Sequence, residues 1–530
     1  MIAFVLAMAL GGAPTPAQAA RGPLVATIQG PVEGKVVNSQ AQFFGIPYGE
    51  PPVGDLRWRP PQPAARWTEP LRATAFGKSC PQLMGPGPMD ARHDESCLFL
   101  NVFTPAATVN GKARLPVMVW IYGGGLEAGE TNNYDGAKLA RQGVVVVTLN
   151  YRLGVLGFFS HPNIDREGHA FANYGLMDQQ LALKWVRDNI AAFGGDPGNV
   201  TIFGESAGGG SVFAQLASPM AAGLFHKAIV QSGSYVAVQS TEVTPIEQAQ
   251  TMGRYFSMAA GCQDLSPACL RKVPVQKLLQ LQPAYEASFI VDGELIPMRF
   301  SEAFATGRFS RVPVLNGANL DEWRLMVAMV ERSSGQKVTP ESYAEALRAN
   351  FSPTDRPYQL IAATPSEVAT KYPLQKYDSA PEALAAAEGD AFMSCPALKM
   401  NSWLSRYVPT YAYEFTYRDA PTTYLPPASF PYGATHTAEL QFLFPNIRWR
   451  SDATIHPLNG REQALSDRMV EYWTTFAKAG VPTTSDTSVV SWPRFTVGDP
   501  RMMKLDLAAS VDDRFSERHQ CQFWGEASLY

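Results

Sequence analysis

The chain has 530 residues, of which 46% are hydrophobic and 17% are charged, and its formal net charge is −4 at pH 7. This composition can fill a large core and is too apolar for a disordered chain. A nucleic-acid-binding protein would need a basic face, and the charge balance does not predict one.

The first 20 residues differ from the rest of the chain. Residues 2–10 are a short apolar run, and residues 17–19 read Ala-Gln-Ala, the Ala-x-Ala pattern of a signal-peptide cleavage site. No positive residues precede the run, which leaves a disordered tail or a misassigned start as alternatives. We expect a signal peptide at residues 1–19, a single domain at 20–530, and a secreted or periplasmic protein. No later run reaches the ~18 apolar residues of a membrane helix.

The first part of the chain predicts strands and one loop. Residues 24–37 alternate and carry glycines, which predicts a hairpin. Residues 43–61 are rich in proline, which favours an ordered surface loop over a strand. Residues 97–103 read as a strand. Residues 115–122 and 143–151 are apolar on both faces, as buried parallel strands are.

Helices and strands alternate through the remaining chain. Helices are predicted at residues 174–193 and 465–477, where apolar side chains recur at helical spacing. Further strands are predicted at residues 200–203, 227–232, 311–317 and 410–417. This alternation predicts an α/β protein with a mostly parallel central sheet flanked by helices. Residues 323–400 are mostly helix-prone, which predicts an inserted helical region.

Residues 204–208 read Gly-Glu-Ser-Ala-Gly, between a strand-like run and a helix-compatible segment. This is the context of a nucleophile elbow, where a sharp turn exposes the serine hydroxyl and glycines avoid crowding. A plain glycine-rich loop is the alternative, because short motifs also arise by chance. Ser206 is therefore the candidate nucleophile, provided that the chain also supplies a base, an acid and an oxyanion hole.

The base of such a site is a histidine that follows the serine and the acid in the chain. Of the seven histidines, His93, His161 and His169 precede Ser206 and His226 lies too close to it, which leaves His436, His456 and His519. His436 is favoured because residues 432–439 form a small-residue loop between a strand and an apolar run. Catalytic groups belong on such loops at strand ends.

Two adjacent acids, Asp321 and Glu322, follow the strand predicted at residues 311–317. Either could orient the imidazole, composition does not choose between them, and a solvated acidic turn is the alternative. The oxyanion hole needs backbone N–H groups, which Ala207 and the glycine loop at residues 123–125 would provide. A phosphate cradle is the competing interpretation, but the Lys-Ser/Thr pair of a P-loop is missing.

Six cysteines in a chain with an export signal favour disulfides over free thiols, although fifteen pairings are possible. None sits in a Cys-x-x-Cys motif or has zinc-site spacing, so no metal site is predicted. Cys80/Cys97 and Cys262/Cys269 would close small local loops. Cys395/Cys521 would then tie the C-terminus to the body of the protein.

Together these motifs resemble one family, the type-B carboxylesterases, which include cholinesterases and bacterial para-nitrobenzyl esterases. The matching segments are residues 44–48, 95–102, 120–125, 203–209, 317–322, 433–436 and 472–477. The resemblance implies an α/β-hydrolase fold and Glu322, not Asp321, as the acid. It implies oxyanion donors at Gly124, Gly125 and Ala207, and disulfides Cys80–Cys97, Cys262–Cys269 and Cys395–Cys521.

Three positions depart from the family pattern. Trp323 replaces the usual glycine after the acid, Thr437 a frequent glycine after the histidine, and Ser96 the aspartate of Glu-Asp-Cys. None of these changes removes a catalytic group, but Trp323 could line or narrow the pocket. No tryptophan lies between Cys80 and Cys97, where cholinesterases place the indole that binds choline. A cation–π site for choline esters is therefore not supported.

We expect a serine hydrolase that cleaves small carboxylic esters through a Ser206–His436–Glu322 triad, without a cofactor. A lipase, a polyester hydrolase or a xenobiotic diester hydrolase would use the same triad, with residues 323–400 as a possible lid. A non-catalytic binding protein on this scaffold is the alternative from another class. Such proteins typically lose the nucleophile or the base, and here both are present.

Overall fold

The computed structural model describes residues 22–83, 92–237, 243–351, 362–422, 425–447 and 457–526. Its central feature is an 11-stranded sheet with the strand order β18-β17-β16-β15-β12-β11-β7-β8-β6-β4-β3. The strands from β17 to β8 run parallel, whereas β18 at one edge and β6, β4 and β3 at the other are antiparallel to their neighbours. The predicted mostly parallel α/β sheet is confirmed.

The parallel strands are short and largely buried. They are β7 (Leu115–Ile121), β8 (Val145–Leu149), β11 (Gly195–Glu205), β12 (Lys227–Gln231), β15 (Val314–Asn319), β16 (Thr410–Phe415) and β17 (Met502–Leu505). Every residue of β8, β12, β15 and β16 is buried. Because both faces are covered, these strands read as continuous apolar runs in the sequence.

The prediction of a surface loop at residues 43–61 is wrong for its first five residues. Residues 43–47 belong to β4 (Gln40–Pro47), which pairs with β3 (Lys35–Val37) and β6 (Phe99–Pro105). The prolines begin only at the last residue of β4, so they mark where the strand ends. The predicted opening hairpin is present as β1 (Leu24–Ala26) and β2 (Pro31–Glu33).

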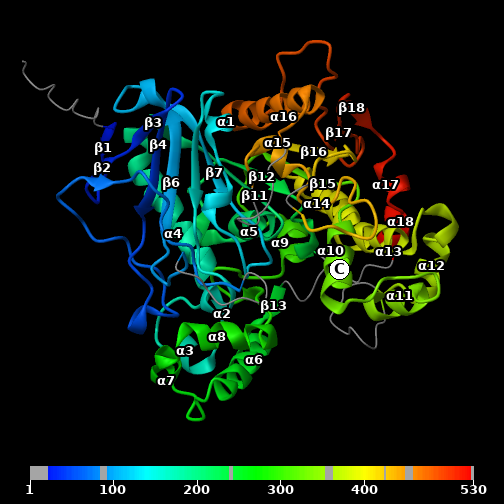
Figure 1. Ribbon diagram of the computed structural model, residues 1–530, viewed down its shortest axis with the longest axis horizontal. Coiled ribbons are helices and arrows are strands. Elements are labelled where there is room, and N and C mark those ends of the chain that lie inside the picture. Colours follow the sequence, from blue (N-terminus) through cyan, green and yellow to red (C-terminus); the bar gives the residue numbers. More distant parts are fainter. Residues whose placement is uncertain are drawn as a thin grey trace, which may run out of the picture.

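Helices cover both faces of the sheet (Figure 1). On one face, α1 (Ala137–Ala140) packs beside α16 (Gly460–Ala479), and on the other α4 (Tyr174–Asn189) packs beside α5 (Ala207–Ala217). Asn459 and Glu462 form a capping box that begins α16, and Gly480 ends it in the left-handed conformation. The centre of the sheet is thereby enclosed.

Two further helical groups lie beside the sheet, one at the bottom of Figure 1 and the other on its right. The first is α6 (Ile246–Ala259), α7 (Pro267–Lys272) and α8 (Val275–Leu281); the second is α10 (Arg324–Ser334), α11 (Tyr343–Phe351), α12 (Pro365–Lys371), α13 (Ala380–Gly389) and α14 (Cys395–Leu404). A π-helical turn at Asp390–Ser394 joins α13 to α14. The second group has its own apolar cluster, which includes Phe351, Val368 and Trp524. Trp524 belongs to α18 (Cys521–Glu526), so the C-terminal helix holds this group in place.

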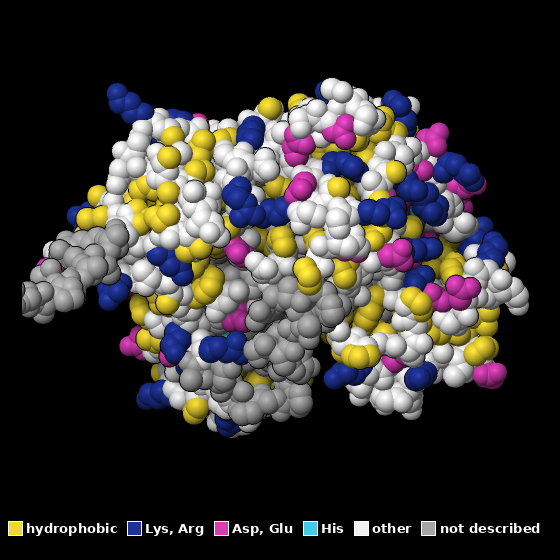
Figure 2. Space-filling view, turned by 45° about the horizontal axis from the view of Figure 1, so that its top comes forward, with side chains coloured by type: hydrophobic (Ala, Val, Ile, Leu, Met, Phe, Trp, Pro, Cys, Tyr) yellow, Lys and Arg dark blue, Asp and Glu magenta, His cyan; other side chains and the backbone are white. Residues whose placement is uncertain are grey.

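All six cysteines form disulfides, in the pairs Cys80–Cys97, Cys262–Cys269 and Cys395–Cys521. Such bonds form and persist in oxidising compartments. Within the described ranges, no helix has the length and apolar character needed to cross a membrane. On the face drawn in Figure 2, Lys and Arg side chains are interspersed with Asp and Glu, in keeping with the small net charge.

Candidate active site

Ser206 occupies a sharp turn between β11 and α5, with φ 56° and ψ −127°. A non-glycine residue rarely adopts a positive φ, and such strain is found most often at functional sites. A Cβ at Gly204 would lie 2.6 Å from the Ile121 carbonyl oxygen, and a Cβ at Gly208 would lie 2.0 Å from the same atom. Both positions therefore require glycine, as a nucleophile elbow does.

The structure brings Glu322 and His436 together. Nδ1 of His436 lies 2.7 Å from Oε2 of Glu322, and the His436 backbone N–H donates to the Glu322 carbonyl oxygen at 3.2 Å. Both side chains are almost fully buried. Asp321, the adjacent acid, instead pairs with Arg418 and Arg324. Of the two carboxylates that composition left open, Glu322 is the one that contacts the imidazole.

The second oxygen of Glu322 is also fully engaged. Oε1 accepts hydrogen bonds from the Ser232 hydroxyl at 2.6 Å and from the Asn319 backbone N–H at 2.7 Å. With donors on both oxygens, the carboxylate cannot rotate freely, so it fixes the orientation and the tautomer of His436. The sequence interpretation missed Ser232, whose only signal is its place at the end of a predicted strand.

Nε2 of His436 lies near Glu205, and among the described residues it has no hydrogen-bond partner. Glu205 Oε1 lies 3.2 Å from this nitrogen without hydrogen-bond geometry, and none of the described residues forms a hydrogen bond with the Ser206 hydroxyl. Bonds between a nucleophile and its base are often long before substrate binds. The imidazole lies between the two glutamates, Glu205 and Glu322, within the elbow region.

Glu205 is fully buried, and within the described chain neither of its carboxylate oxygens accepts a hydrogen bond. Burial raises the pKa of Glu205 well above its usual value; His436 opposes this shift, while Glu439 and Glu322 add to it. A buried carboxylate without donors is strongly disfavoured. Burial therefore favours the protonated form of Glu205, which lies beside Nε2 of His436.

Burial lowers the pKa of His436, but the charges of Glu205 and Glu322 outweigh it and raise the pKa to about 9. Glu205 contributes to this rise in pKa only while it is ionised. The titrations of Glu205 and His436 are therefore coupled, with one proton shared between the carboxyl group and the imidazole. A general base must be neutral to accept the serine proton. The arrangement that can act as a base is neutral His436 beside protonated Glu205.

The glycine loop that follows β7 lies directly against the elbow. A Cβ at Gly123 would lie 2.8 Å from Cβ of Ser206. Gly124, Gly125 and Leu126 have φ values of 110°, 64° and 61°. Consecutive residues in such conformations can aim their N–H groups into one concavity, which suits an anion.

The backbone donors expected at this concavity are Gly124, Gly125 and Ala207. In the described part of the chain, no acceptor is bonded to the N–H of Gly124, Gly125 or Ala207. Ala207 is the first residue of α5, so its N–H also lies at the positive end of that helix. Three unpaired donors beside a strained serine can stabilise a developing oxyanion.

Comparison with known proteins identifies the family. Residues 21–524 match the model of the Carboxylesterase family. The chain is 36% identical over 530 residues to the para-nitrobenzyl esterase of Bacillus subtilis (strain 168), covering 94% of this chain and 98% of that protein. It is 34% identical over 533 residues to the cocaine esterase of Oryctolagus cuniculus, covering 96% of each.

This chain belongs to the carboxylesterase family. Among solved structures it resembles a PNB esterase with a TM-score of 0.75 at 34% identity, over 94% of this chain and all of the other (100%). A thermophilic PNB esterase gives a TM-score of 0.77 at 33% identity, with the same coverage. The predicted α/β-hydrolase fold is confirmed, and the protein is a carboxylic ester hydrolase.

The other two histidine candidates of this carboxylesterase lie elsewhere. His519 is buried between Asp390 and Glu414, with Nε2 at 2.5 Å from Glu414 Oε1. His456 lies outside the described residues. Among the histidines that the structure describes, His436 is the one that contacts Glu322.

Two of the departures from the family pattern lie next to the site. The Trp323 ring packs against Phe392 of the π-helical turn, with ring centroids 5.5 Å apart. Thr437 has φ 72°, a conformation in which glycine is unstrained. Trp323 therefore connects the acid-bearing loop to the second helical group in this carboxylesterase.

Proposed function

We propose that this carboxylesterase hydrolyses esters through an acyl-enzyme on Ser206. His436 is the general base and acid, Glu322 orients it, and the N–H groups of Gly124, Gly125 and Ala207 form the oxyanion hole. The observation that carries the proposal is the strained Ser206 turn beside a buried His436–Glu322 pair at 2.7 Å. The oxyanion roles rest on the unpaired donors and on the resemblance.

In acylation, the Ser206 hydroxyl attacks the ester carbonyl carbon while His436 Nε2 accepts its proton. The carbonyl oxygen becomes an oxyanion and receives hydrogen bonds from the unpaired N–H groups. Glu322 stabilises the imidazolium without taking the proton itself. The imidazolium then protonates the leaving alcohol, which departs and leaves the acyl group on Ser206.

In deacylation, water replaces the alcohol. Neutral His436 removes a proton from the water as the oxygen attacks the acyl carbon, and the oxyanion forms again at the same donors. The imidazolium returns this proton to Ser206, and the carboxylic acid is released. Each step needs one base and one anion site, and the Ser206 region provides both.

Small uncharged carboxylic esters are the proposed substrates. The relatives named above are a para-nitrobenzyl esterase and a cocaine esterase, which supports esters of moderate size. The missing tryptophan between Cys80 and Cys97 argues against choline esters. Hydrolysis rates for a series of esters with increasing acyl and alcohol size would show which sizes the pocket accepts. A preference for long or polymeric esters would instead indicate a lipase or a polyester hydrolase.

We also propose that the protein is exported. Three disulfides and an Ala-Gln-Ala sequence at residues 17–19 support a secreted or periplasmic location. Fractionation of cells that express the full chain, with N-terminal sequencing of the product, tests this assignment. A product in the cytoplasm that retains Met1 would contradict it.

The function is tested with Ser206→Ala and a fluorophosphonate probe, which labels an activated serine. The parent protein is expected to give a burst with an activated aryl ester and to be labelled. Ser206→Ala should lose both while its thermal unfolding midpoint stays similar. Ser211→Ala, which changes a buried serine in the same helix, is the control and should keep both. Turnover by Ser206→Ala near the parent rate would overturn the proposal.

A further inference from the structure

Asp321 makes no hydrogen bond or ion pair with the imidazole, yet it joins its own loop, which also carries Glu322, to the loop that carries His436. Its carboxylate is almost fully buried, and Oδ2 accepts the Ala434 backbone N–H at 3.0 Å. In the other direction, the Asp321 N–H donates to the Ala434 carbonyl oxygen at 3.0 Å. Asp321 and Ala434 therefore form a closed pair of hydrogen bonds between the two loops.

Further bonds extend this pairing along both loops. Asn319 Nδ2 donates to the Thr435 carbonyl oxygen at 2.8 Å, and Leu325 N–H donates to the Thr435 hydroxyl at 2.8 Å. The His436 N–H to Glu322 carbonyl bond completes the series. Backbone and side-chain bonds on both sides of Asp321 therefore join the two loops that carry the proposed triad residues.

Gly433 allows the Asp321 carboxylate to approach so closely. Gly433 has φ 62°, and a Cβ there would lie 2.4 Å from Asp321 Oδ2. Any other residue would push the carboxylate away from the Ala434 N–H. The glycine and the carboxylate are therefore complementary parts of one contact.

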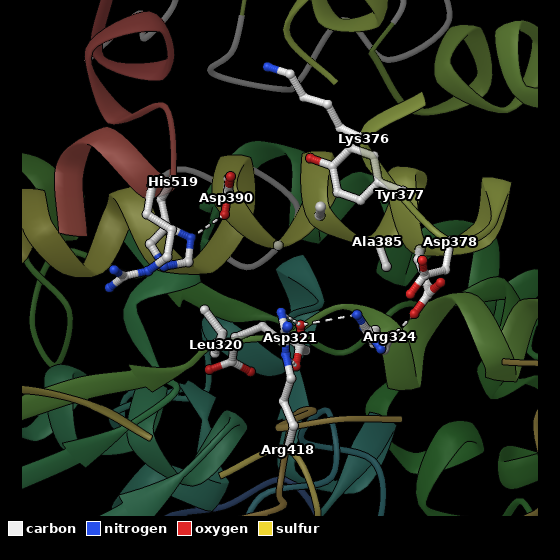
Figure 3. Close-up of a pocket in the computed structure, with 15 residues that line it drawn as sticks. Leu320, Asp321, Arg324, Lys376, Tyr377, Asp378, Ala385, Asp390, Arg418 and His519 are labelled. Carbon is white, nitrogen blue, oxygen red and sulfur yellow. Dashed lines mark hydrogen bonds and ion pairs between the residues drawn. The ribbon is translucent and has the colours of Figure 1, made fainter. Parts of the chain in front are cut away.

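Two arginines hold the other side of the carboxylate (Figure 3). Arg418 makes a bidentate pair with Asp321, Nε to Oδ2 at 2.8 Å and Nη2 to Oδ1 at 2.9 Å. Arg324 Nη2 lies 3.3 Å from Oδ1, and its Nη1 lies 2.8 Å from Glu382. Bidentate pairs of this kind fix geometry as well as charge.

These arginines and Asp321 line a cavity of about 250 Å³, with Asp390 and His519 farther across it in Figure 3. The Arg418 side chain is 57% exposed and that of Asp321 is 6% exposed. Neutralising Asp321 would leave Arg418 hydrated and Arg324 paired with Glu382. The fold should therefore tolerate Asp321→Asn, because no buried cation loses its only partner.

We propose that Asp321 is a positioning residue for ester hydrolysis, which holds the Glu322 loop and the His436 loop at their catalytic separation. This inference rests on the proposed triad. A carboxylate accepts the Ala434 N–H and both Arg418 donors together. An asparagine offers one acceptor oxygen, and its amide group would face a donor. Small displacements of catalytic groups are costly, since about 1 Å can reduce the rate roughly 100-fold.

The test compares Asp321→Asn with Asp378→Asn in the full-length protein. Asp378 lines the same cavity but is exposed, and among the described residues no hydrogen bond or ion pair joins it to either loop, so it is the matched control. For Asp321→Asn we expect kcat to fall roughly 10- to 100-fold, with KM changing less than about threefold. Fluorophosphonate labelling of Ser206 should slow by a similar factor. Asp378→Asn should retain the parent kcat and labelling rate.

A second variant keeps the test decisive if Asp321→Asn does not fold. Gly433→Ala keeps every charge but places a methyl group where the Asp321 carboxylate lies, so it should give the same selective loss of kcat.

If Ser206→Ala is inactive and the folded Asp321 variant keeps the parent kcat, the positioning role is wrong. Equal changes in kcat and KM with normal labelling would also overturn it. If Ser206→Ala stays active, the proposed function itself has failed.

Discussion

The hydroxyl of Ser232 donates a 2.6 Å hydrogen bond to Oε1 of Glu322, whose Oε2 faces His436 Nδ1 at 2.7 Å. Ser232→Ala would leave the Asn319 N–H as the remaining donor to Oε1. A hydrogen bond to a charged group contributes roughly 1.5–3 kcal/mol. If part of that energy serves to orient the imidazole, kcat should fall about 10-fold, measured by steady-state hydrolysis of an activated aryl ester.

Ser234→Ala is the control for this experiment. The Ser234 hydroxyl is also buried, but it donates to Asn316 Oδ1 at 3.3 Å and not to the proposed triad. This variant should lose some thermal stability and keep its kcat. Equal rates for Ser232→Ala and the parent protein would show that Glu322 is held without the hydroxyl.

Glu205 and Glu322 should affect the pH profile of kcat/KM differently. Glu322→Gln removes a charge that raises the pKa of His436, so the imidazole stays neutral to lower pH. The acid limb of the residual activity should therefore move to lower pH. The rate should fall by about 10⁴, as expected when the acid of a triad becomes an amide.

Glu205→Gln should leave the midpoint of the acid limb nearly unchanged. Burial raises the pKa of Glu205 and favours its protonated form, and a neutral amide of similar shape would reproduce the electrostatic effect of that form. Both variants are measured with one uncharged ester over the same pH range. A shift of the Glu205→Gln midpoint to lower pH by about one unit or more would show an ionised Glu205 in the working protein.

The fold was readable from the sequence where local patterns determine structure. Continuous apolar runs mark β7 and β8 because both faces of the sheet are covered by helices. The motif at residues 204–208 marks the elbow because glycine is sterically required at both ends. β4 was missed because the prolines at its end outweighed the apolar residues before them.

The site was less readable, because its contacts join distant parts of the chain. Asp321 and Glu322 follow the same strand, and only the position of the His436 loop separates their roles. Ser232 lies 90 residues from Glu322 in the sequence, and no periodic pattern links them. Glu205 is part of the motif itself, but its burial and its distance to His436 depend on the packed core.

His519 should make stability depend on pH above neutrality. Burial lowers its pKa, but Asp390 and Glu414 on either side raise it to about 10. Tyr372 donates to Asp390, and Arg518 pairs with Glu414, so the cluster joins α17 (Phe515–Arg518) to the π-helical turn and β16. A raised pKa contributes stability that is complete below about pH 6.5, the unfolded value, and is lost as the pH approaches about 10.

His519→Gln tests this dependence by chemical unfolding at several pH values between 6 and 10. The parent protein should exceed the variant in free energy of unfolding most strongly near pH 6, and the difference should shrink as the pH rises. The variant lacks the imidazolium at every pH, so it is the reference for this one group. A difference that stays constant between pH 6 and 10 would show that His519 contributes through packing and not through its charge.

The disulfides should differ in how much they stabilise the fold. Cys395–Cys521 closes a loop with a sequence separation of 126, and Cys262–Cys269 one of 7. Loop-closure entropy gives about 5 kcal/mol for the first and about 2 kcal/mol for the second. Replacing both cysteines of each pair with serine should therefore lower the thermal midpoint more for the long loop.

Cys395–Cys521 also joins α14 to α18, whose Trp524 packs in the second helical cluster. Its loss should therefore loosen that group first, seen as faster proteolysis within residues 323–404. Equal midpoints for the two double variants would show that native packing, not chain entropy, sets the contribution of these bonds.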